Sequence, residues 1–269
     1  MHLRSKGLVV DRPSVAAKKI EAIGYERLRI YFLSRRDQPG KTFRPGTTYN
    51  DILQLYECDA RLRVLCFEAV GRFELTFRNT LSGVLGARYG SHPCDSLAAF
   101  RNTTSRDQAR TDMLRIYSKS RDERARHYRS TYNTPDLPPI WMFTEFLTFG
   151  ETARLYETLA NDVRDEIAKR FGIGSVQVFD QWVPCFVDLR NTCAHHGRLF
   201  NRRFQKQTPR FRKAGVPTAP PNTLKALLEC VDYALSSIGE KAGTVDAALR
   251  LMRLRMHAAA DPAEAGFEV

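Results

Sequence analysis

The segment from Val187 to Phe204, VDLRNTCAHHGRLFNRRF, combines two adjacent histidines with a guanidinium, an amide and further arginines. An imidazole titrates near neutral pH, so it can take or give a proton under physiological conditions. A guanidinium can bind two phosphate oxygens at once and can stabilise charge that develops on a reacting phosphate. These residue types suit proton transfer on a bound polyanion. The competing interpretation is a solvated basic helix end, where histidines interact only with the helix dipole.

Helical spacing decides which of these side chains can act together. If residues 176 to 198 form a helix, Asn191 and His195 are four positions apart and share one face. Arg190 lies at the flank of that face, and its long side chain can reach round to it. We therefore expect Arg190, Asn191 and His195 to converge on one ligand, with His196 as the second candidate histidine.

The chemistry that fits these groups is cleavage within RNA by attack of a 2′-hydroxyl. His195 would take the proton from that hydroxyl or give one to the leaving oxygen. Arg190 would hold the phosphate, and Asn191 would orient the imidazole or the ribose. No metal or other cofactor is needed. Because one histidine cannot readily be both base and acid in one turnover, we expect a homodimer to supply a second copy.

A zinc site is the other chemistry that these residue types allow. Its ligands would be Cys185, Cys193, His195 and His196. Adjacent histidines on a helix diverge, and no fourth ligand stands at metal spacing. The sequence therefore favours a site without metal.

Positive charge is concentrated just after the histidines. The chain has 42 Lys and Arg against 30 Asp and Glu, and no acid lies between Asp188 and Glu229. The basic residues expected to bind RNA are Arg198, Arg202, Arg203, Lys206, Arg210, Arg212 and Lys213. The phenylalanines interleaved among them are Phe200, Phe204 and Phe211. Basic residues alternating with aromatics suit a phosphate backbone and stacked, unpaired bases. A solvated charged loop is the alternative.

The composition of the chain is that of a globular protein. Of its 269 residues, 43% are hydrophobic and 27% charged, and no window of 18 residues is continuously apolar, so no membrane partner is expected. The N-terminal residues carry no secretion signal, which predicts a cytoplasmic protein. The six cysteines form no C-x-x-C pair and are expected to be buried thiols in a reducing compartment: Cys58, Cys66, Cys94, Cys185, Cys193 and Cys230.

The apolar periodicity is helical almost throughout, and no alternating strand pattern is present. Ser14 is placed to cap a first helix that ends at Gly24. Thr48 and Asp51 resemble a capping box that opens a very long helix to Gly90. The expected buried stripe of the histidine-bearing helix is Phe179, Trp182, Phe186, Leu189 and Cys193, with Pro184 kinking or starting that helix.

Residues 91–135 are polar and arginine-rich, which predicts a helical excursion at the periphery. Pro139 is expected to open one helix through IWMFTEFLTFGETARLYETLA. A charged helix, a basic loop to about residue 222 and two closing helices follow. We therefore predict an all-α helical bundle, a single domain over 1–269 whose core is about 14–90 and 136–256.

Several ordered blocks resemble a known family. Arg190-Asn191-x-x-x-His195 resembles the R-N-x-x-x-H signature of the HEPN superfamily. The longer run LRNTCAHHGRLFNR is similar to the hallmark of its Abi-like abortive-infection proteins, the AbiD/AbiF group. Three further blocks are similar to family blocks in the family's order: IGYERLRIYF, FRPGTTYNDILQLYECDARLRVLCFEAVGRFELTFRN and LPPIWMFTEFLTFGETARLYETL. Together they cover most of residues 14–205.

The resemblance implies an all-α fold of HEPN type and a role in anti-phage defence. It also implies metal-independent endoribonuclease activity at a composite dimer site. Carried over by position, Arg190 and His195 would be catalytic, with Asn191 in support, while His196 fits the looser spacing of some members. Some members only bind RNA, so a non-catalytic RNA-binding or phage-sensing module is the alternative. A small non-coding RNA is a further candidate partner, as inhibitor or guide.

Overall fold

The computed structural model describes residues 2–37, 41–255 and 261–267. Within these ranges all regular structure is helical, and β-type pairing is limited to four isolated bridges. The expected all-α fold is confirmed. The α-helices are α1 (His2–Ser5), α2 (Pro13–Ile23), α3 (Tyr25–Leu33), α4 (Tyr49–Tyr89), α5 (Thr103–Lys119), α6 (Glu123–Thr131), α7 (Ile140–Phe143), α8 (Phe149–Thr158), α9 (Asn161–Arg170), α10 (Val176–Ala194), α11 (Leu224–Ser237) and α12 (Thr244–Arg255). Short 3₁₀ turns are η1 (Pro93–Asp95), η2 (Leu97–Ala99), η3 (Thr144–Phe146) and η4 (Pro262–Ala265).

The 41-residue helix α4 is the axis of the molecule, about 60 Å long at 1.5 Å per residue. It begins at the predicted capping box, in which the Thr48 hydroxyl accepts the Asp51 N–H and the Asp51 carboxylate accepts the Thr48 N–H. It ends at Gly90, whose positive φ of 75° stops a right-handed helix at little cost. Both ends therefore follow from local residue chemistry.

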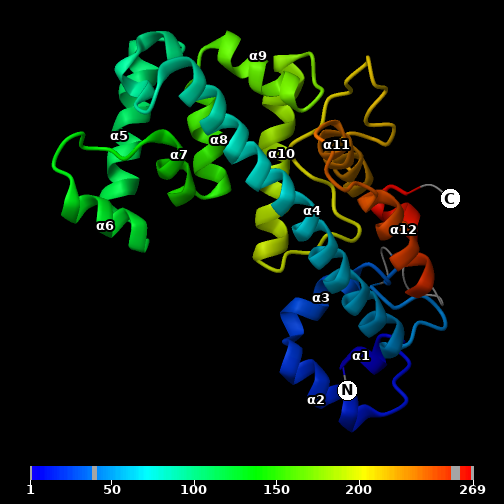
Figure 1. The fold of residues 1–269 in the computed structure, drawn as a ribbon. Helices are drawn as coiled ribbons and strands as arrows, with labels where there is room; N and C mark the ends of the chain where they lie inside the picture. Colours follow the sequence, from blue (N-terminus) through cyan, green and yellow to red (C-terminus); the bar gives the residue numbers. More distant parts are fainter. Residues whose placement is uncertain (1, 38–40, 256–260, 268–269) are drawn as a thin grey trace.

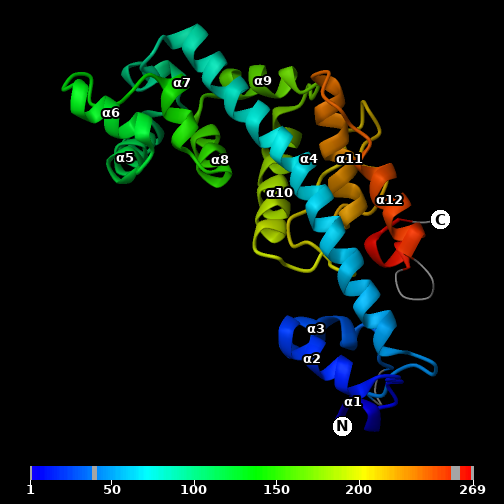
Figure 2. The same ribbon diagram turned by 60° about the horizontal axis from the view of Figure 1, so that its bottom comes forward.

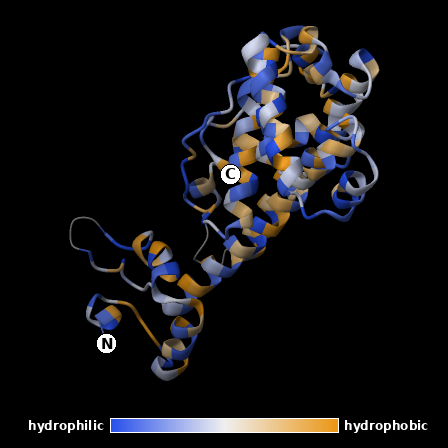
Figure 3. Cartoon of the chain, turned by 90° about the vertical axis from the view of Figure 1, so that its left-hand side faces the viewer, coloured by the Kyte–Doolittle hydropathy of each residue, from blue (hydrophilic) through white to orange (hydrophobic). Residues whose placement is uncertain are grey.

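The other helices are arranged along α4 (Figures 1 and 2). Helices α1 to α3 lie at its N-terminal end, and α5 to α7 lie at its C-terminal end. Helices α10, α11 and α12 pack along its length. Figure 3 shows apolar residues concentrated where these helices meet, while the connecting loops are largely hydrophilic. No helix in the described ranges is both long and apolar enough to cross a lipid bilayer.

Aromatic side chains from α4, α8 and α10 meet in the centre of the core. Phe73 of α4 lies 4.8 Å from Phe186 of α10, centroid to centroid, and 5.0 Å from Phe171. Phe77 packs edge-on to Tyr156 of α8 at 5.5 Å. Such ring pairs add to the burial of large apolar surfaces. They fix α10 against the middle of α4.

Several expected helix boundaries are wrong. Helix α2 begins at Pro13 with Arg12 as its N-cap, so Ser14 lies inside the helix. Its start is earlier because proline is favoured at the first helical position. The single helix expected after Pro139 is broken into α7, η3 and α8. The break falls where Thr148 forms its own capping box with Glu151. Pro184 lies inside α10, which begins at Val176, so it does not start this helix.

Other helices that the periodicity predicts are also found. The polar segment 91–134 is helical, through η1, η2, α5 and α6. Helix α9 ends just before Gly172, and helices α11 and α12 close the chain, as the periodicity indicates. All six cysteines are free and buried.

Candidate functional site

Helix α10 carries the candidate residues at its C-terminal end. Its predicted stripe is buried, with Phe179, Trp182, Phe186, Leu189 and Cys193 all at most 5% exposed. This stripe faces α4 and the neighbouring helices. Burial of the stripe fixes the rotation of α10, and so it fixes which residues of its last two turns face solvent.

The helix ends in a Schellman motif around the two histidines. His195 is the C-cap, and His196 has a left-handed backbone with φ of 55°. The Gly197 N–H donates to the Thr192 carbonyl at 2.7 Å, and the His196 N–H donates to the Cys193 carbonyl at 3.1 Å. The expectation of a helix to residue 198 is therefore wrong, because a residue with positive φ cannot continue a right-handed helix.

The residue directly after the histidines, Gly197, lies in a tight space. A Cβ on Gly197 would lie 2.9 Å from Cγ2 of Thr192 and 3.0 Å from its carbonyl oxygen. The turn folds back so closely on the last helical turn that a side chain there would force Thr192 or the turn to shift. In the sequence His-His-Gly, His195 is therefore the C-cap, His196 has the left-handed backbone, and Gly197 occupies a space too tight for a side chain without a shift.

Both imidazoles are exposed. The His195 N–H donates to the Asn191 carbonyl at 2.9 Å, so His195 still lies one turn beyond Asn191. Neither imidazole makes a hydrogen bond or ion pair in the part of the chain that the structure describes. Their side chains are therefore accessible to a ligand at the end of α10.

The Arg190 guanidinium is held between α10 and α4. Its Nη1 donates to Oδ1 of Asn191 at 3.2 Å, and its Nε is ion-paired with Oε2 of Glu74 at 3.3 Å, outside hydrogen-bond geometry. The guanidinium carbon lies 5.9 Å from the ring centroid of Phe67. Glu74 also pairs with Arg78 at 3.0 Å, as its i,i+4 spacing predicts. Arg190 and Asn191 are thus brought together, and His195 follows at the next turn.

A buried carboxylate that the sequence analysis missed holds the segment after the histidines. Asp59 of α4 is fully buried and accepts the backbone N–H of Phe200 at 2.8 Å and that of Leu199 at 3.2 Å. Its other oxygen accepts from the Tyr31 hydroxyl and from Nη1 of Arg63, both at 2.6 Å. Four donors therefore surround this one side chain, and α3, α4 and the chain after α10 meet there.

Electrostatics at Asp59 reflect this burial. Burial raises the pKa of the Asp59 carboxyl, while the Tyr31 hydroxyl, the Arg63 charge and the two backbone N–H groups oppose the rise. Burial, together with the neighbouring carboxylate, also raises the pKa of Tyr31. Tyr31 therefore remains a hydrogen-bond donor at neutral pH.

Two arginines contact the carbonyls of the histidine turn itself. Nη1 of Arg63 lies 3.4 Å from the carbonyl oxygen of Gly197, and Nη1 of Arg27 lies 3.3 Å from that of His196. The signal for this arrangement was present in the sequence. Asp59 and Arg63 are four positions apart and lie within the apolar stripe of α4. Charged residues on a buried face are rarely found without a partner, so this spacing indicates a buried ion pair.

In the basic segment after the turn, most of the charged side chains are exposed to solvent, whereas the aromatic rings are buried. Five of its basic side chains are exposed and have no ion pair in the described residues: Arg203, Lys206, Arg210, Arg212 and Lys213. Arg198 and Arg202 are partly buried, and Arg202 lies over the Phe204 ring. The expectation that the phenylalanines stack on bases is wrong. Phe200, Phe204 and Phe211 are at most 6% exposed, because they anchor the loop to the core.

The zinc arrangement considered from the sequence does not assemble. Cys185 and Cys193 are buried, whereas both histidines are exposed, so the four side chains do not face a common point. No group of three or more His, Cys, Asp or Glu residues able to hold a metal occurs among the described residues.

Comparison with known proteins identifies a family. The family model described as Abi-like protein matches residues 18–201, which is more than half of the chain and includes α3, α4 and the whole of α10. No curated protein and no solved structure matches the chain.

Proposed function

Because this chain belongs to the Abi-like protein family, we propose that it is a metal-independent endoribonuclease acting in abortive infection, the anti-phage response for which the family is named. The observation that carries the proposal is the end of α10. There, Arg190, Asn191, His195 and His196 lie within two helical turns, and the imidazoles are exposed and unpaired within the described residues.

Each group has a role that its environment supports. The Arg190 guanidinium binds a non-bridging phosphate oxygen and stabilises the charge that develops on it. Contacts with Glu74 and Asn191 fix the direction of the guanidinium. The Arg190 side chain is still 27% exposed, so part of the guanidinium can contact a phosphate. His195 transfers the proton of the 2′-hydroxyl or of the leaving oxygen. Asn191 orients the imidazole or the ribose.

A second copy of the chain would complete the site. Val64, Phe67 and Leu75 of α4 are 70%, 44% and 62% exposed and lie on one face of the helix. Gly71 lies among them and leaves open space at its Cα, and the exposed Glu68 lies on the same face. The Arg190 guanidinium lies over Phe67, so this apolar face borders the histidine site. A two-fold dimer through it would bring two copies of the 190–196 segment together and supply both base and acid.

The exposed basic side chains of residues 203–213 would bind the RNA backbone. Their charges are not neutralised by ion pairs within the described residues, so they remain available to phosphates. Since the rings of this segment are buried, the contact is electrostatic and not a stacking platform. RNA affinity should therefore fall steeply as salt concentration rises.

The test is cleavage of mixed RNA by the purified protein in the presence of EDTA, with analysis of the fragment ends. Attack by the 2′-hydroxyl leaves a 2′,3′-cyclic phosphate and a 5′-hydroxyl, and DNA should not be cut. His195→Ala should lower the rate on the order of a hundred- to ten-thousand-fold with RNA binding nearly intact. His127→Ala, an exposed histidine on α6, is the matched control. Cleavage that stops in EDTA, or that survives His195→Ala combined with His196→Ala, contradicts the mechanism.

A non-catalytic RNA-binding or phage-sensing module is the second candidate. It is favoured by the pairing of Arg190 with Glu74, which offsets the charge that a scissile phosphate would need. This candidate requires the basic segment but not His195. RNA binding without cleavage, unchanged by His195→Ala, would support it.

A further inference from the structure

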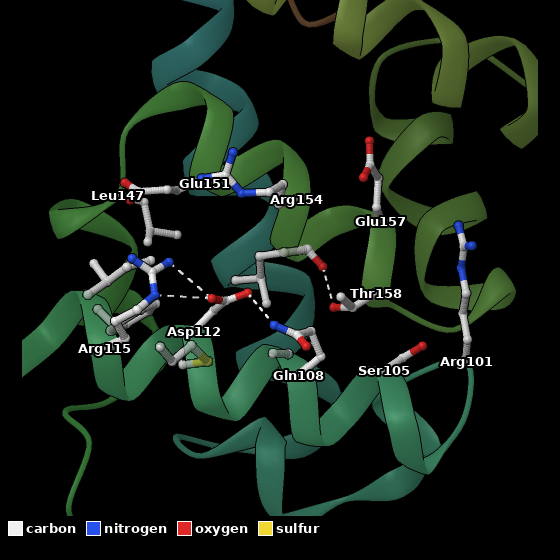
Figure 4. A pocket seen from close by; sticks show the side chains of 15 residues that line it. Arg101, Ser105, Gln108, Asp112, Arg115, Leu147, Glu151, Arg154, Glu157 and Thr158 are labelled. Atoms are coloured by element: carbon white, nitrogen blue, oxygen red, sulfur yellow. Dashed lines mark hydrogen bonds and ion pairs between the residues drawn. The ribbon is translucent and has the colours of Figure 1, made fainter.

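A cavity lies between α5 and α8, on a part of the molecule that the proposed mechanism does not use. Its volume is about 440 Å³, within the range of pockets that hold small molecules. Figure 4 shows its two walls. Gln108, Asp112 and Arg115 come from α5, and Arg154 and Glu157 come from α8.

The walls of this α5–α8 cavity are fixed by hydrogen bonds. Asp112 accepts from Gln108 at 3.0 Å and from Arg115 at 3.0 Å, which orders the α5 wall. The capping box of Thr148 and Glu151 fixes the start of α8. Nη2 of Arg78 donates to the Leu147 carbonyl at 3.0 Å, which holds the residue before that start. These contacts order both walls of the cavity.

The floor is apolar and the rim is charged. The floor includes the buried side chains of Met113, Phe143, Leu147 and Leu155, which offer a surface to a flat or apolar group. This floor sits at the boundary between the peripheral helices and the central core. A ligand there would make apolar contacts with the floor and polar contacts with the rim, as is usual in small-molecule sites.

Pairing within the rim determines which charges remain for a ligand. Arg115 is paired with Asp112, and Glu151 is occupied by Thr148. Arg101, Arg154 and Glu157 have no ion pair or side-chain hydrogen bond in the described residues. These two guanidinium groups and this carboxylate therefore remain available to contact a ligand at the rim (Figure 4).

From these groups we infer that the α5–α8 cavity binds a ribonucleoside phosphate. The Arg101 guanidinium, which Figure 4 shows at the same end of the cavity as Glu157, binds the phosphate, for which the arginine fork is suited. The Glu157 carboxylate accepts hydrogen bonds from ribose hydroxyls, and the base lies on the apolar floor with its edge toward Gln108. Such a ligand is either a free nucleotide or one unit of an RNA chain. The inference is independent of whether the α10 site cleaves RNA.

Isothermal titration calorimetry with the four ribonucleoside monophosphates tests this site on the full chain. At least one should bind, and the nucleoside without phosphate and inorganic phosphate alone should each bind at least tenfold more weakly. Arg101→Gln should weaken binding at least tenfold, and Arg154→Gln, at the opposite end of the cavity, should weaken it less. Glu157→Gln should reduce the preference for the ribonucleotide over its 2′-deoxy form. Arg121→Gln, an exposed arginine between α5 and α6 that does not line the cavity, should change nothing.

The two sources of the ligand are separated by competition. A short oligoribonucleotide keeps the 2′-hydroxyl donors that Glu157 recognises, and the protein carrying both His195→Ala and His196→Ala is used so that binding is measured without cleavage. Displacement of the mononucleotide by this oligonucleotide identifies an RNA unit, and absence of displacement identifies a free nucleotide. The inference is overturned if no ribonucleoside monophosphate binds at millimolar concentration. It is equally overturned if the cavity variants, confirmed as folded by thermal melting, bind as tightly as Arg121→Gln.

Discussion

The fully buried carboxylate of Asp59 accepts the backbone N–H of Phe200 at 2.8 Å, across 141 positions of the chain. This one contact joins the middle of α4 to the segment that follows the two histidines. Because Asp59 also accepts from Tyr31 and Arg63, the position of the histidine turn depends on a polar group deep in the core.

Asp59→Asn tests this dependence. The amide leaves Arg63, a residue that is 6% exposed, without its buried counter-charge. Removing one partner of a buried pair typically costs about 3 to 5 kcal/mol in the free energy of unfolding. We expect a loss of that order in urea denaturation and slower RNA cleavage well below the melting temperature. Glu26→Gln removes the acid of an exposed pair with Arg29 and should change stability little. Equal effects of the two substitutions would contradict a structural role for Asp59.

Gly197→Ala tests the compact turn after the histidines. The added Cβ would lie 2.9 Å from Cγ2 of Thr192, so the turn or the end of α10 must shift. We expect a loss of about 1 to 3 kcal/mol in the free energy of unfolding, as for other overpacked sites. Gly83→Ala on α4 is the control, since a Cβ there meets nothing within 4 Å. It should stabilise the helix by about 0.5 to 1 kcal/mol. In urea denaturation, Gly197→Ala should lower the midpoint and Gly83→Ala should raise it.

His196→Gly separates backbone cost from chemical role. His196 holds φ of 55°, a conformation that costs an L-residue roughly 1 kcal/mol and glycine almost nothing. The substitution should therefore raise the free energy of unfolding by up to about 1 kcal/mol. If His195 is the proton-transfer residue, RNA cleavage should fall only mildly. A cleavage rate as low as that of His195→Ala would show that the left-handed histidine is the catalytic one.

The sequence predicted the helices well because their signals are local. The capping box of Thr48 and Asp51 and the glycine after Tyr89 each act within one turn, and both are found in the structure. The end of α10 was missed because His196 takes a backbone conformation that glycine usually supplies, and no local rule identifies a histidine there. Tertiary contacts with α3 and α4 hold it in place.

The candidate site was predictable in its residues but not in its environment. Spacing places Asn191 and His195 one turn apart, and the structure retains that relation. The pairing of Arg190 with Glu74 joins positions 116 residues apart, and no pattern within α10 indicates it. The basic segment shows the same limit. Its phenylalanines look like stacking groups in the sequence, yet their burial follows from how the loop folds over α10 and α11.

The thiols should resist alkylation in the native protein. Burial raises the pKa of Cys94 to about 11 and that of Cys185 to about 12. A hydrogen bond with Cys193, followed by burial, raises the pKa of Cys66 as well. The thiolate is the reactive form, so a raised pKa lowers its fraction at pH 8. We expect iodoacetamide to label none of the six cysteines appreciably at pH 8, and all six in denaturant. Rapid native labelling of Cys185 would contradict its burial.

The last prediction concerns the exposed apolar face of α4 beside the site. If a second copy covers Val64, Phe67 and Leu75, a charge placed there must be buried without a partner, which is costly. Val64→Glu and Leu75→Glu should each raise the dimer dissociation constant at least tenfold, measured by analytical ultracentrifugation. Cleavage should fall at low protein concentration and recover as concentration rises, because the site needs both copies. Leu97→Glu, on an exposed leucine in η2, is the control and should leave assembly unchanged. A wild-type protein that is monomeric and active at every concentration would contradict the composite site, while the roles of Arg190 and His195 within one copy would remain open to the alanine tests.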